Sequence, residues 1–371
     1  MPSLLITDPV AEVTSRFAND RTTIGGDTRS LRLRAKAPLR VSFAGGGTDV
    51  APFPETEGGA VLSATIARYA YGSLTPRPDG EITVSSEDLG VSLQFGVNAA
   101  LTLDGKLDLA KAAACHLGEL AGGELHGYDL KIQSSAPPGS GLGSSSAVMV
   151  ALVGLLRDRY GLQMDAYQVA RTAHHLERYD LGIRGGQQDH YAAAFGGFNY
   201  IEFLGGDHVV VNPLRIREDT LAELEHNLLL CFTGRTRASD HIIADQSARL
   251  VNAEADTVAG LRAQKELATK MKHALLQNRL HDFGVLLDEA WHQKKRISPK
   301  ISTPYIDEAY AAARAAGALG GKITGAGGGG FMLIYCDFDS KRRVAAALTD
   351  LDMTVEEITF APAGLSTWSP R

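Results

Sequence analysis

In PPGSGLGSSSAVMVALVGLL, residues 137–156, glycines 139, 141 and 143 precede three serines and an apolar run. Glycine permits positive φ and lets backbone N–H groups approach a ligand closely. The apolar run predicts a buried helix that begins near Ser144, and the free N–H groups at a helix start favour an anion. We therefore predict a phosphate-binding loop. The alternative is a plain loop before a serine-capped helix.

This loop differs from two familiar phosphate-binding loops. A Walker A loop ends in Gly-Lys-Ser/Thr, whereas Ser144 follows Gly143 here with no lysine between them. The dinucleotide fingerprint GxGxxG is also broken, because the segment reads GSGLGS. The family must therefore be sought in other parts of the chain.

Composition predicts a globular protein of two domains. The chain has 371 residues, of which 44% are apolar and 22% charged. Its net charge of −6 gives no indication of nucleic-acid binding, which usually requires a basic surface. Cys115, Cys231 and Cys336 lie far apart without a CxxC pair, which argues against disulfide scaffolds and zinc knuckles. Neither a signal peptide nor an apolar run of membrane-spanning length is visible. We expect a cytoplasmic protein without nucleic-acid or membrane partners. The oligomeric state is left open, with a homodimer as one option.

The order of patterns along the chain predicts an α+β fold. Residues 1–30 are interpreted as an N-terminal extension, and residues 31–47 as a strand, a bend and a second strand that ends in a glycine turn. Further strands and helices follow as far as residue 205, after which the composition becomes dominantly helical. Thr303 and Pro304 are typical of a helix start. We predict one domain over residues 31–210 and another over residues 211–371.

Two further glycine turns point to a family. They are APLRVSFAGGGTD at residues 37–49 and KITGAGGGGF at residues 322–331. Together with the loop at 137–147, and in this order, they resemble the GHMP kinases, the superfamily of galactokinase, homoserine kinase, mevalonate kinase and phosphomevalonate kinase. The resemblance covers residues 31–371. It implies ATP and Mg²⁺, an N-terminal domain like the second domain of ribosomal protein S5, a ferredoxin-like C-terminal domain, and an active site between them.

A narrower likeness rests on five segments, AGGGTD, GGQQDHYAAAFGGFNYIEF, FTGRTRASDHIIADQ, HQKKRISPKIST and GALGGKITGAGGGGFML. Together they resemble the D-glycero-D-manno-heptose 7-phosphate kinases, which implies transfer of a phosphoryl group to the anomeric C1 hydroxyl and a 1,7-bisphosphate product. GGG at residues 45–47 replaces the GEH of galactokinase-like members, which favours the heptose branch. Two alternatives stay open: a fucokinase- or galactokinase-like enzyme for a free sugar, and a non-catalytic sugar-sensing protein on the same fold.

The resemblance also implies where the nucleotide and its metal bind. The phosphates of ATP would lie against Pro138, Gly139, Ser140, Gly141, Leu142, Gly143, Ser144, Ser145 and Ser146. Ser145 and Glu177 would ligate Mg²⁺, which accepts one or two protein oxygens and keeps several waters. The alternative for Glu177 is an ordinary surface residue that pairs with a cation along its helix.

Asp189 and Arg40 are the implied catalytic residues. Asp189 follows GGQQ and would take the proton of the acceptor hydroxyl. Arg40 would keep that carboxylate ionised and balance charge on the phosphoryl group. As an alternative, Asp189 caps the helix that follows it.

The acceptor is expected to bind at both outer glycine turns. The implied residues are Gly46, Gly47, Thr48 and Asp49 from the first turn and Gly327 and Gly328 from the third. Arginine suits forked phosphate contacts, so Arg235 and Arg237 are the preferred pair for the acceptor phosphate, followed by Arg184. Lys294, Lys295, Arg296 and Lys300 are further candidates for that phosphate, and the alternative, which we favour for this run, is a solvated helix end. His174, His175 and His190 are interpreted as satisfied or surface histidines, because no metal-binding pattern surrounds them.

Overall fold

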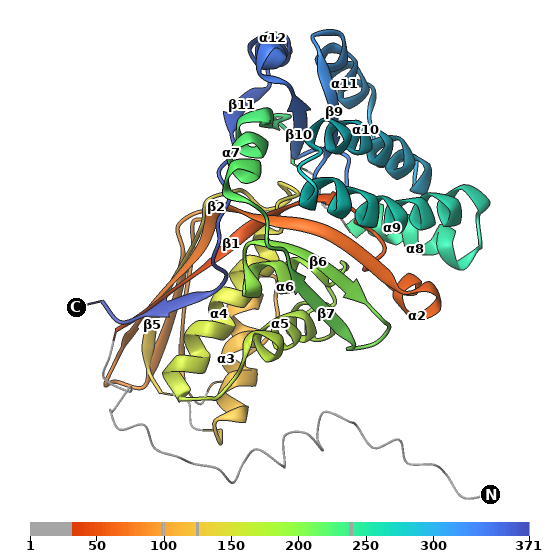
Figure 1. Ribbon diagram of the computed structural model, residues 1–371. Helices are drawn as coiled ribbons and strands as arrows, with labels where there is room; N and C mark the ends of the chain where they lie inside the picture. The colour runs from red at the N-terminus through yellow and green to blue at the C-terminus, as the bar shows by residue number, and fades with distance from the viewer. Residues whose placement is uncertain (1–31, 98, 100, 124–125, 237–239, 371) are drawn as a thin grey trace, which may run out of the picture.

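The fold consists of two β-sheets with helices packed around and between them (Figure 1). The computed structural model describes residues 32–97, 99, 101–123, 126–236 and 240–370. The predicted N-terminal extension at 1–30 therefore lies outside the described residues. Within the part of the chain that is described, no helix is both long and apolar enough to cross a membrane.

The first sheet has eight strands. β12, β1, β2, β5, β3 and β4 lie side by side in this order, β6 also pairs with β2, and β7 pairs with β6. Only β3 and β5 run parallel. The strands are β1 (Leu33–Ala44), β2 (Gly59–Pro76), β3 (Glu81–Ser86), β4 (Val91–Gly96), β5 (Tyr128–Ser134), β6 (Phe198–Phe203), β7 (Val209–Pro213) and β12 (Ser366–Trp368).

The strand β1 carries Arg40 and leads into the first glycine turn. The predicted bend within residues 31–47 is absent, since β1 continues as one strand with register shifts after Pro38 and after Ser42. A bulge lets a strand bend without ending, and a proline that cannot donate to the ladder often sits beside one. Residues from Ala37 to Ala44 are buried because helices cover both faces of the sheet there.

The two helical layers come from different parts of the chain (Figure 1). One face of the first sheet is covered by α3 (Asp108–Leu120), α4 (Ser144–Tyr160), α5 (Ala166–His175) and α6 (Gln188–Phe195). The opposite face of β1 and β2 packs against α9 (Ala255–Leu276) and, through β1, α10 (Leu280–Ile297). The short helix α2 (Phe53–Glu57) connects β1 to β2.

The second sheet has the strand order expected of a ferredoxin-like unit. Its four antiparallel strands lie in the order β11 (Thr354–Glu357), β8 (Leu228–Phe232), β10 (Phe331–Cys336) and β9 (Ala318–Ile323). Numbered along the chain this is 4-1-3-2, which matches the ferredoxin-like arrangement and confirms the predicted α+β fold. The remaining helices are α7 (Glu218–Asn227), α8 (Asp240–Val251), α11 (Pro304–Ala315) and α12 (Phe338–Thr349).

Two details bear on the predicted organisation. α11 begins at Pro304 with Thr303 as its cap, because the Thr303 hydroxyl accepts the N–H of Ile306 at 3.3 Å, as the sequence predicts. The chain passes from the first sheet to the second between β7 and β8, yet β12 returns to pair with β1. The domain limits at 210 and 211 stay a prediction.

Two glycines set the distance between α10 and the second sheet. A Cβ atom built on Gly320 of β9 would lie 2.1 Å from the carbonyl oxygen of Gly284 in α10. Gly284 in turn fits against Leu319 and the ring of Tyr335, where a Cβ would lie 2.5 Å from the nearest ring atom. Backbone cannot move aside as a side-chain end can, so this contact fixes where α10 lies.

We therefore expect Gly320→Ala to destabilise the protein by about 1–3 kcal/mol, because the new methyl group forces α10 away from β9. Gly96→Ala is the control, since the nearest atom to its added Cβ is a side-chain oxygen at 3.8 Å. Urea denaturation followed by circular dichroism measures both. Equal midpoints for the two variants would contradict this account of the α10–β9 contact.

Candidate active site

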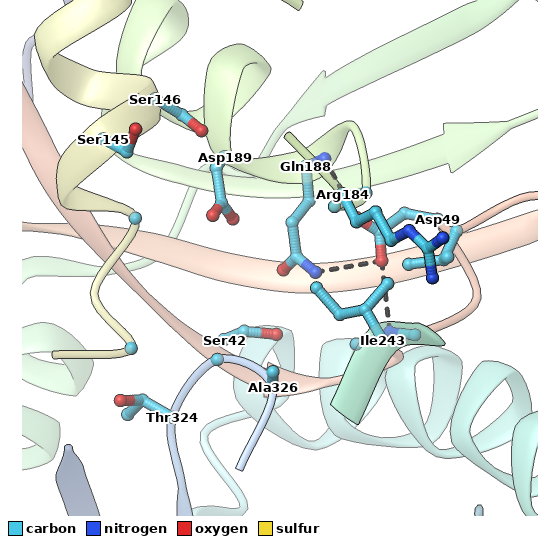
Figure 2. Close-up of a pocket in the computed structure, with 18 of the residues that line it drawn as sticks. Ser42, Asp49, Ser145, Ser146, Arg184, Gln188, Asp189, Ile243, Thr324 and Ala326 are labelled. Atoms are coloured by element: carbon cyan, nitrogen blue, oxygen red, sulfur yellow. Dashed lines mark hydrogen bonds between the residues drawn. The ribbon is translucent and has the colours of Figure 1, made fainter. Parts of the chain in front are cut away.

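The three glycine turns meet at one cleft between the two sheets, with an empty volume of about 1040 Å³ (Figure 2). The backbone N–H of Phe331, after the third turn, donates to the carbonyl oxygen of Ser140 in the second turn at 3.0 Å. A Cβ on Gly141 would lie 2.6 Å from the carbonyl oxygen of Thr324. Glycine is therefore required where these two backbones approach each other.

The helix α4 points its N-terminus into the cleft. Its N-cap is Gly143, which has φ +73° and no side chain to form a cap, so the alternative of a serine-capped helix is wrong. The first intrahelical bond runs from the Ala147 N–H to the Gly143 carbonyl oxygen at 2.9 Å. The N–H groups of the three preceding serines therefore have no intrahelical partner, and all three serines line the cleft. This combination of free donors and helix dipole suits an anion.

Glu177 lies behind this helix start and is buried, with 1% of its surface exposed. The alternative of a surface residue is therefore wrong. It lies in η2 (Leu176–Asp180), a π-helical turn closed by a bond from the Leu181 N–H to the Leu176 carbonyl oxygen. The wider turn follows α5 directly and includes a residue that lines the cleft, and π-turns often occur at such sites.

Three neighbours orient the carboxylate of Glu177. Its Oε2 accepts hydrogen bonds from Ser146 Oγ at 2.7 Å and from His190 Nε2 at 2.6 Å. Burial raises the pKa of Glu177, but the hydrogen bond and charge of His190, together with Arg178, outweigh burial and hold the pKa well below its ordinary value. The carboxylate is ionised, and Oε1 is left facing Arg178 at 3.4 Å.

Asp189 and Arg40 form an ion pair at the centre of the cleft (Figure 2 shows the carboxylate). Arg40 Nε and Nη2 both lie 2.7 Å from Asp189 Oδ1, and Nη1 donates to the Gly141 carbonyl oxygen at 2.6 Å. Asp189 Oδ2 faces Gly143, where a Cβ would lie 3.2 Å away. Asp189 is in the first turn of α6 and its N-cap is Gln187, so the capping alternative is wrong.

Asp49 lies further along the cleft and is fixed by amide groups. Its Oδ1 accepts from the Gly47 N–H at 3.1 Å and from Gln188 Nε2 at 3.0 Å, and its Oδ2 accepts from the Gln188 N–H at 3.1 Å (Figure 2). A Cβ on Gly186 would lie 1.9 Å from Oδ2, so glycine is needed there. Burial and the charge of Asp189 raise the pKa of Asp49, and these hydrogen bonds limit the rise.

Several buried polar atoms on the cleft wall lack a partner among the described residues. They include Ser42 Oγ, Ser140 Oγ and Gln188 Oε1. Buried polar atoms are normally hydrogen-bonded, so a set of unpaired ones around one cleft indicates a polar ligand. Arg184 also lines the cleft, is exposed, and lies next to Asp49 in Figure 2.

The predicted residues divide into those that line the cleft and those that do not. The cleft brings together the following predicted residues: Arg40, Gly46, Gly47, Asp49, Gly139, Ser140, Gly141, Gly143, Ser144, Ser145, Ser146, Glu177, Arg184, Asp189 and Gly327. Pro138 is exposed and Leu142 packs in the core. Thr48 is buried and donates to backbone oxygens of Gly45 and Ala60.

The third turn and the arginine pair also differ in part from expectation. Gly328 donates its N–H to the Ile301 carbonyl oxygen and does not line the cleft. Arg235 is exposed, with its guanidinium over the ring of Tyr305 at 5.8 Å, and does not line the cleft either. Arg237 lies outside the described residues.

Lys294 is a clear correction. The solvated helix end favoured for residues 294–300 is wrong at Lys294, which is 4% exposed and lines the cleft, where its Nζ donates to the Gly325 carbonyl oxygen. Its neighbour Lys295 behaves as predicted, with an exposed ion pair to Asp307. Burial, reinforced by the charge of Arg40, lowers the pKa of Lys294 to about 8.

Sequence reasoning gave no role to some residues that shape the site. Gln188 stands in the GGQQD segment but was given no function there, and it holds Asp49. Gln246 Nε2 donates to the Gly47 carbonyl oxygen at 3.0 Å from α8, a contact that no local pattern signals. His190 is buried and bonded at Nε2, and the described residues contain no group of three or more metal-ligating side chains.

Comparisons with known proteins agree with this geometry. The family description GHMP kinases N terminal domain matches residues 108–197, and GHMP kinases C terminal matches residues 271–351. The chain is 36% identical over 339 residues to the D-glycero-alpha-D-manno-heptose 7-phosphate kinase of Campylobacter jejuni, which covers 91% of this chain and 98% of that protein. The chain belongs to the GHMP kinases, and it is an ATP-dependent sugar kinase.

Solved structures give the same result. A D-glycero-D-manno-heptose 1-phosphate kinase from Bacteroides thetaiotaomicron superposes with a TM-score of 0.78 at 33% identity, covering 91% of this chain and 99% of that one. Lactococcus lactis galactokinase, in complex with galactose, superposes with a TM-score of 0.72 at 20% identity, covering 97% of this chain and 100% of its own, and supports the fold alone.

The buried position of Lys294 yields a stability prediction. Because its pKa falls from 10.5 to about 8 on folding, the cost of burying the ammonium is present in full below pH 8 and declines as pH rises towards 10.5. Lys294→Met should therefore raise the free energy of unfolding of the ligand-free protein at pH 7 by about 1–3 kcal/mol. The gain should shrink as pH rises from 8 to 10.

Urea denaturation at pH 7, 8 and 10 measures this gain. The matched control is Lys295→Met, one residue along α10, which loses an exposed ion pair to Asp307 and the contact of its ammonium with the Trp291 ring at 5.6 Å, and should shift stability by less than about 1 kcal/mol at each pH. A Lys294→Met protein that is less stable than the wild type at pH 7 would show that the ammonium does not destabilise the ligand-free fold.

Proposed function

We propose that this protein transfers the γ-phosphoryl group of ATP to the C1 hydroxyl of a heptose 7-phosphate, which gives the 1,7-bisphosphate and ADP. One observation carries the proposal. The Asp189 carboxylate, paired with Arg40, lies beside the N-terminus of α4 in the cleft where the three glycine turns meet. Phosphoryl transfer needs a positioned acceptor, an anion cradle and a group that receives a proton, and this arrangement supports all three.

The nucleotide end of the cleft is the start of α4. The unpaired N–H groups of Ser144, Ser145 and Ser146 and the flexible backbone at Gly139 and Gly141 suit the β- and γ-phosphates of ATP. The side chain of Leu142 packs in the core and its carbonyl oxygen accepts the Arg40 N–H at 3.0 Å, which anchors the turn.

The residues beside α4 fit Mg²⁺. Glu177 is ionised and buried, its Oε2 is held by Ser146 and His190, and Ser145 offers a hydroxyl from the same cleft wall. A magnesium ion bound to ATP needs only one or two protein oxygens, so a cluster of three ligands is not required. We propose Ser145 and Glu177 as these ligands. When bound, the metal neutralises phosphate charge.

Asp189 is proposed to receive the proton. The C1 oxygen of the sugar forms a bond to the γ-phosphorus, its proton passes to Asp189 Oδ2, and the bond from the γ-phosphorus to the bridging oxygen breaks, so that ADP leaves with that electron pair. Oδ2 is the oxygen that Arg40 does not bind. Arg40 keeps the carboxylate ionised and oriented.

Asp49 and its neighbours are proposed to hold the acceptor. Asp49 and the free Gln188 Oε1 can accept hydrogen bonds from sugar hydroxyls, and Ser42 Oγ is also free. Arg184 lines the same cleft and is exposed, and its guanidinium suits the phosphate at the far end of a seven-carbon chain. Arg235 and Arg237 stay further candidates for that phosphate.

An acceptor screen tests the proposed function. Purified protein is incubated with ATP, Mg²⁺ and heptose 7-phosphate, heptose 1-phosphate, free heptose, galactose or fucose, and ³¹P NMR locates the new phosphate. We expect kcat/KM for heptose 7-phosphate to exceed that for each other acceptor by at least about tenfold. The other acceptors have no phosphate at C7, so Arg184 would have no phosphate to bind. Chelation of Mg²⁺ should abolish turnover. Preference for a free sugar would reject the acceptor, and no turnover with any of them would favour a sensor.

Asp189→Asn tests the proposed base. The amide cannot take the proton, so kcat should fall at least about 100-fold while ATP binding, measured by calorimetry, stays within about threefold of the wild type. Asp339→Asn, an exposed carboxylate at the start of α12, is the control and should keep its activity. A folded Asp189→Asn protein with kcat within about tenfold of the wild type removes the base assignment.

A further inference from the structure

Lys294 is a buried cation of the cleft that has no role in the reaction as proposed above. It lies in the last turn of α10, where Lys295 and Arg296 point outward to exposed ion pairs with Asp307 and Asp256. Lys294 alone of these three lines the cleft, and it is 4% exposed. It therefore differs from its neighbours in environment although the sequence presents all three as one cationic run.

The ammonium group has donors to spare. Its hydrogen bond with the described part of the chain goes to the Gly325 carbonyl oxygen in the third glycine turn. Among the described residues, no carboxylate lies within ion-pair distance of Nζ. An ammonium has three N–H donors, so two remain for a ligand.

The charged groups around Lys294 are already occupied with other partners. The ones that act on it are Arg40, Asp49 and Asp189, and the buried Lys322 is a further cation nearby. Asp189 is paired with Arg40, and Asp49 is held by amides of Gly47 and Gln188. Lys322 Nζ donates hydrogen bonds to the carbonyl oxygens of Ser42 and Phe43, at 2.9 Å and 3.1 Å.

Burying an ammonium group without a counterion lowers the free energy of unfolding of the ligand-free protein. The cost is offset when an anionic ligand supplies the counterion, and the position of this one restricts which anion it is. Lys294 lies within electrostatic reach of both the proposed base Asp189 and the proposed sugar-binding Asp49. The anionic group that moves from ATP to the sugar near these two carboxylates is the phosphoryl group.

We propose that Lys294 is a catalytic residue whose ammonium binds the equatorial oxygens of the phosphoryl group during its transfer. This inference rests on the proposed function. Charge spreads over those oxygens in the transition state, and a preorganised cation in a water-poor site stabilises it. Arg40 is committed to another role, because three of its five N–H groups are bound to Asp189 and Gly141 and hold the proposed base in place. Lys294 comes from α10, which packs against the second sheet, and Asp189 comes from α6, which covers the first sheet. Both parts of the fold therefore contribute to the reacting centre.

Two measurements on Lys294→Met, Lys294→Arg and the control Lys295→Met test the proposal. The first is steady-state kinetics with heptose 7-phosphate. We expect Lys294→Met to lower kcat at least about 100-fold with the KM of the sugar within about threefold, Lys294→Arg to recover part of the rate, and Lys295→Met to match the wild type. The second is calorimetry without acceptor, which compares the affinity for a non-hydrolysable ATP analogue with that for ADP, both with Mg²⁺.

The calorimetric result separates this inference from the proposed function. If Lys294 touches the γ-phosphoryl group, the wild type should prefer the ATP analogue by about tenfold or more over ADP, and Lys294→Met should lose that preference. This holds whichever sugar is the acceptor. If the wild type leaves heptose 7-phosphate unchanged but Lys294→Met still loses the preference, the proposed function fails and the inference stands.

Three results would overturn the role of Lys294. The first is an unchanged rate and an unchanged nucleotide preference in Lys294→Met. The second is a higher KM of the sugar phosphate at constant kcat, which would make Lys294 a contact of the acceptor. The third is a wild type that binds no nucleotide, which would remove the proposed function as well. Denaturation midpoints at or above that of the wild type would exclude misfolding as the cause of a lost rate.

Discussion

The buried ion pair between Arg40 and Asp189 is the interaction on which the rest of the site depends. Taking two charges out of water is costly unless their remaining donors and acceptors are satisfied. Here Nε and Nη2 of Arg40 meet one carboxylate oxygen and Nη1 meets the Gly141 carbonyl oxygen. The pair thereby joins β1, α6 and the turn before α4, and it leaves Asp189 Oδ2 directed at the cleft.

Hydrogen bonds from β9, α8 and α9 attach the second sheet and its neighbouring helices to the end of β1 and the first glycine turn. Lys322 of β9 donates to the carbonyl oxygens of Ser42 and Phe43 at the end of β1. Gln264 of α9 accepts the Gly45 N–H at 3.1 Å, and Gln246 of α8 donates to the Gly47 carbonyl oxygen. Each of these hydrogen bonds satisfies a backbone group that a buried turn would otherwise leave unpaired, so the cleft is complete only when both parts of the fold are joined.

The sequence predicts what local patterns determine. The apolar run after Ser144 and the Thr303 cap are such patterns, and their helices begin where expected. A motif also shows which segments meet, but it does not show which way each side chain points, so Leu142 and Thr48 turn out to face the interior. The sequence does not distinguish Lys294 from the other cations of its run, because only the packing of α10 against the third turn buries it. The π-turn at Glu177 is likewise a product of tertiary contacts.

The charges of the cleft oppose those of the whole molecule. The chain carries a net charge of −6, yet the cleft combines the start of α4 and four basic side chains (Arg40, Arg178, Arg184 and Lys294) with three carboxylates (Asp49, Glu177 and Asp189) that already have partners. A negative surface disfavours extended polyanions, while a recessed positive site attracts a small phosphorylated ligand over a short range. Burial of cations such as Lys294 destabilises the ligand-free fold. The same burial strengthens their attraction to a bound phosphate, because few waters are left to compete for it. Stability given up in the ligand-free fold is thus the source of binding and transition-state stabilisation in the loaded one.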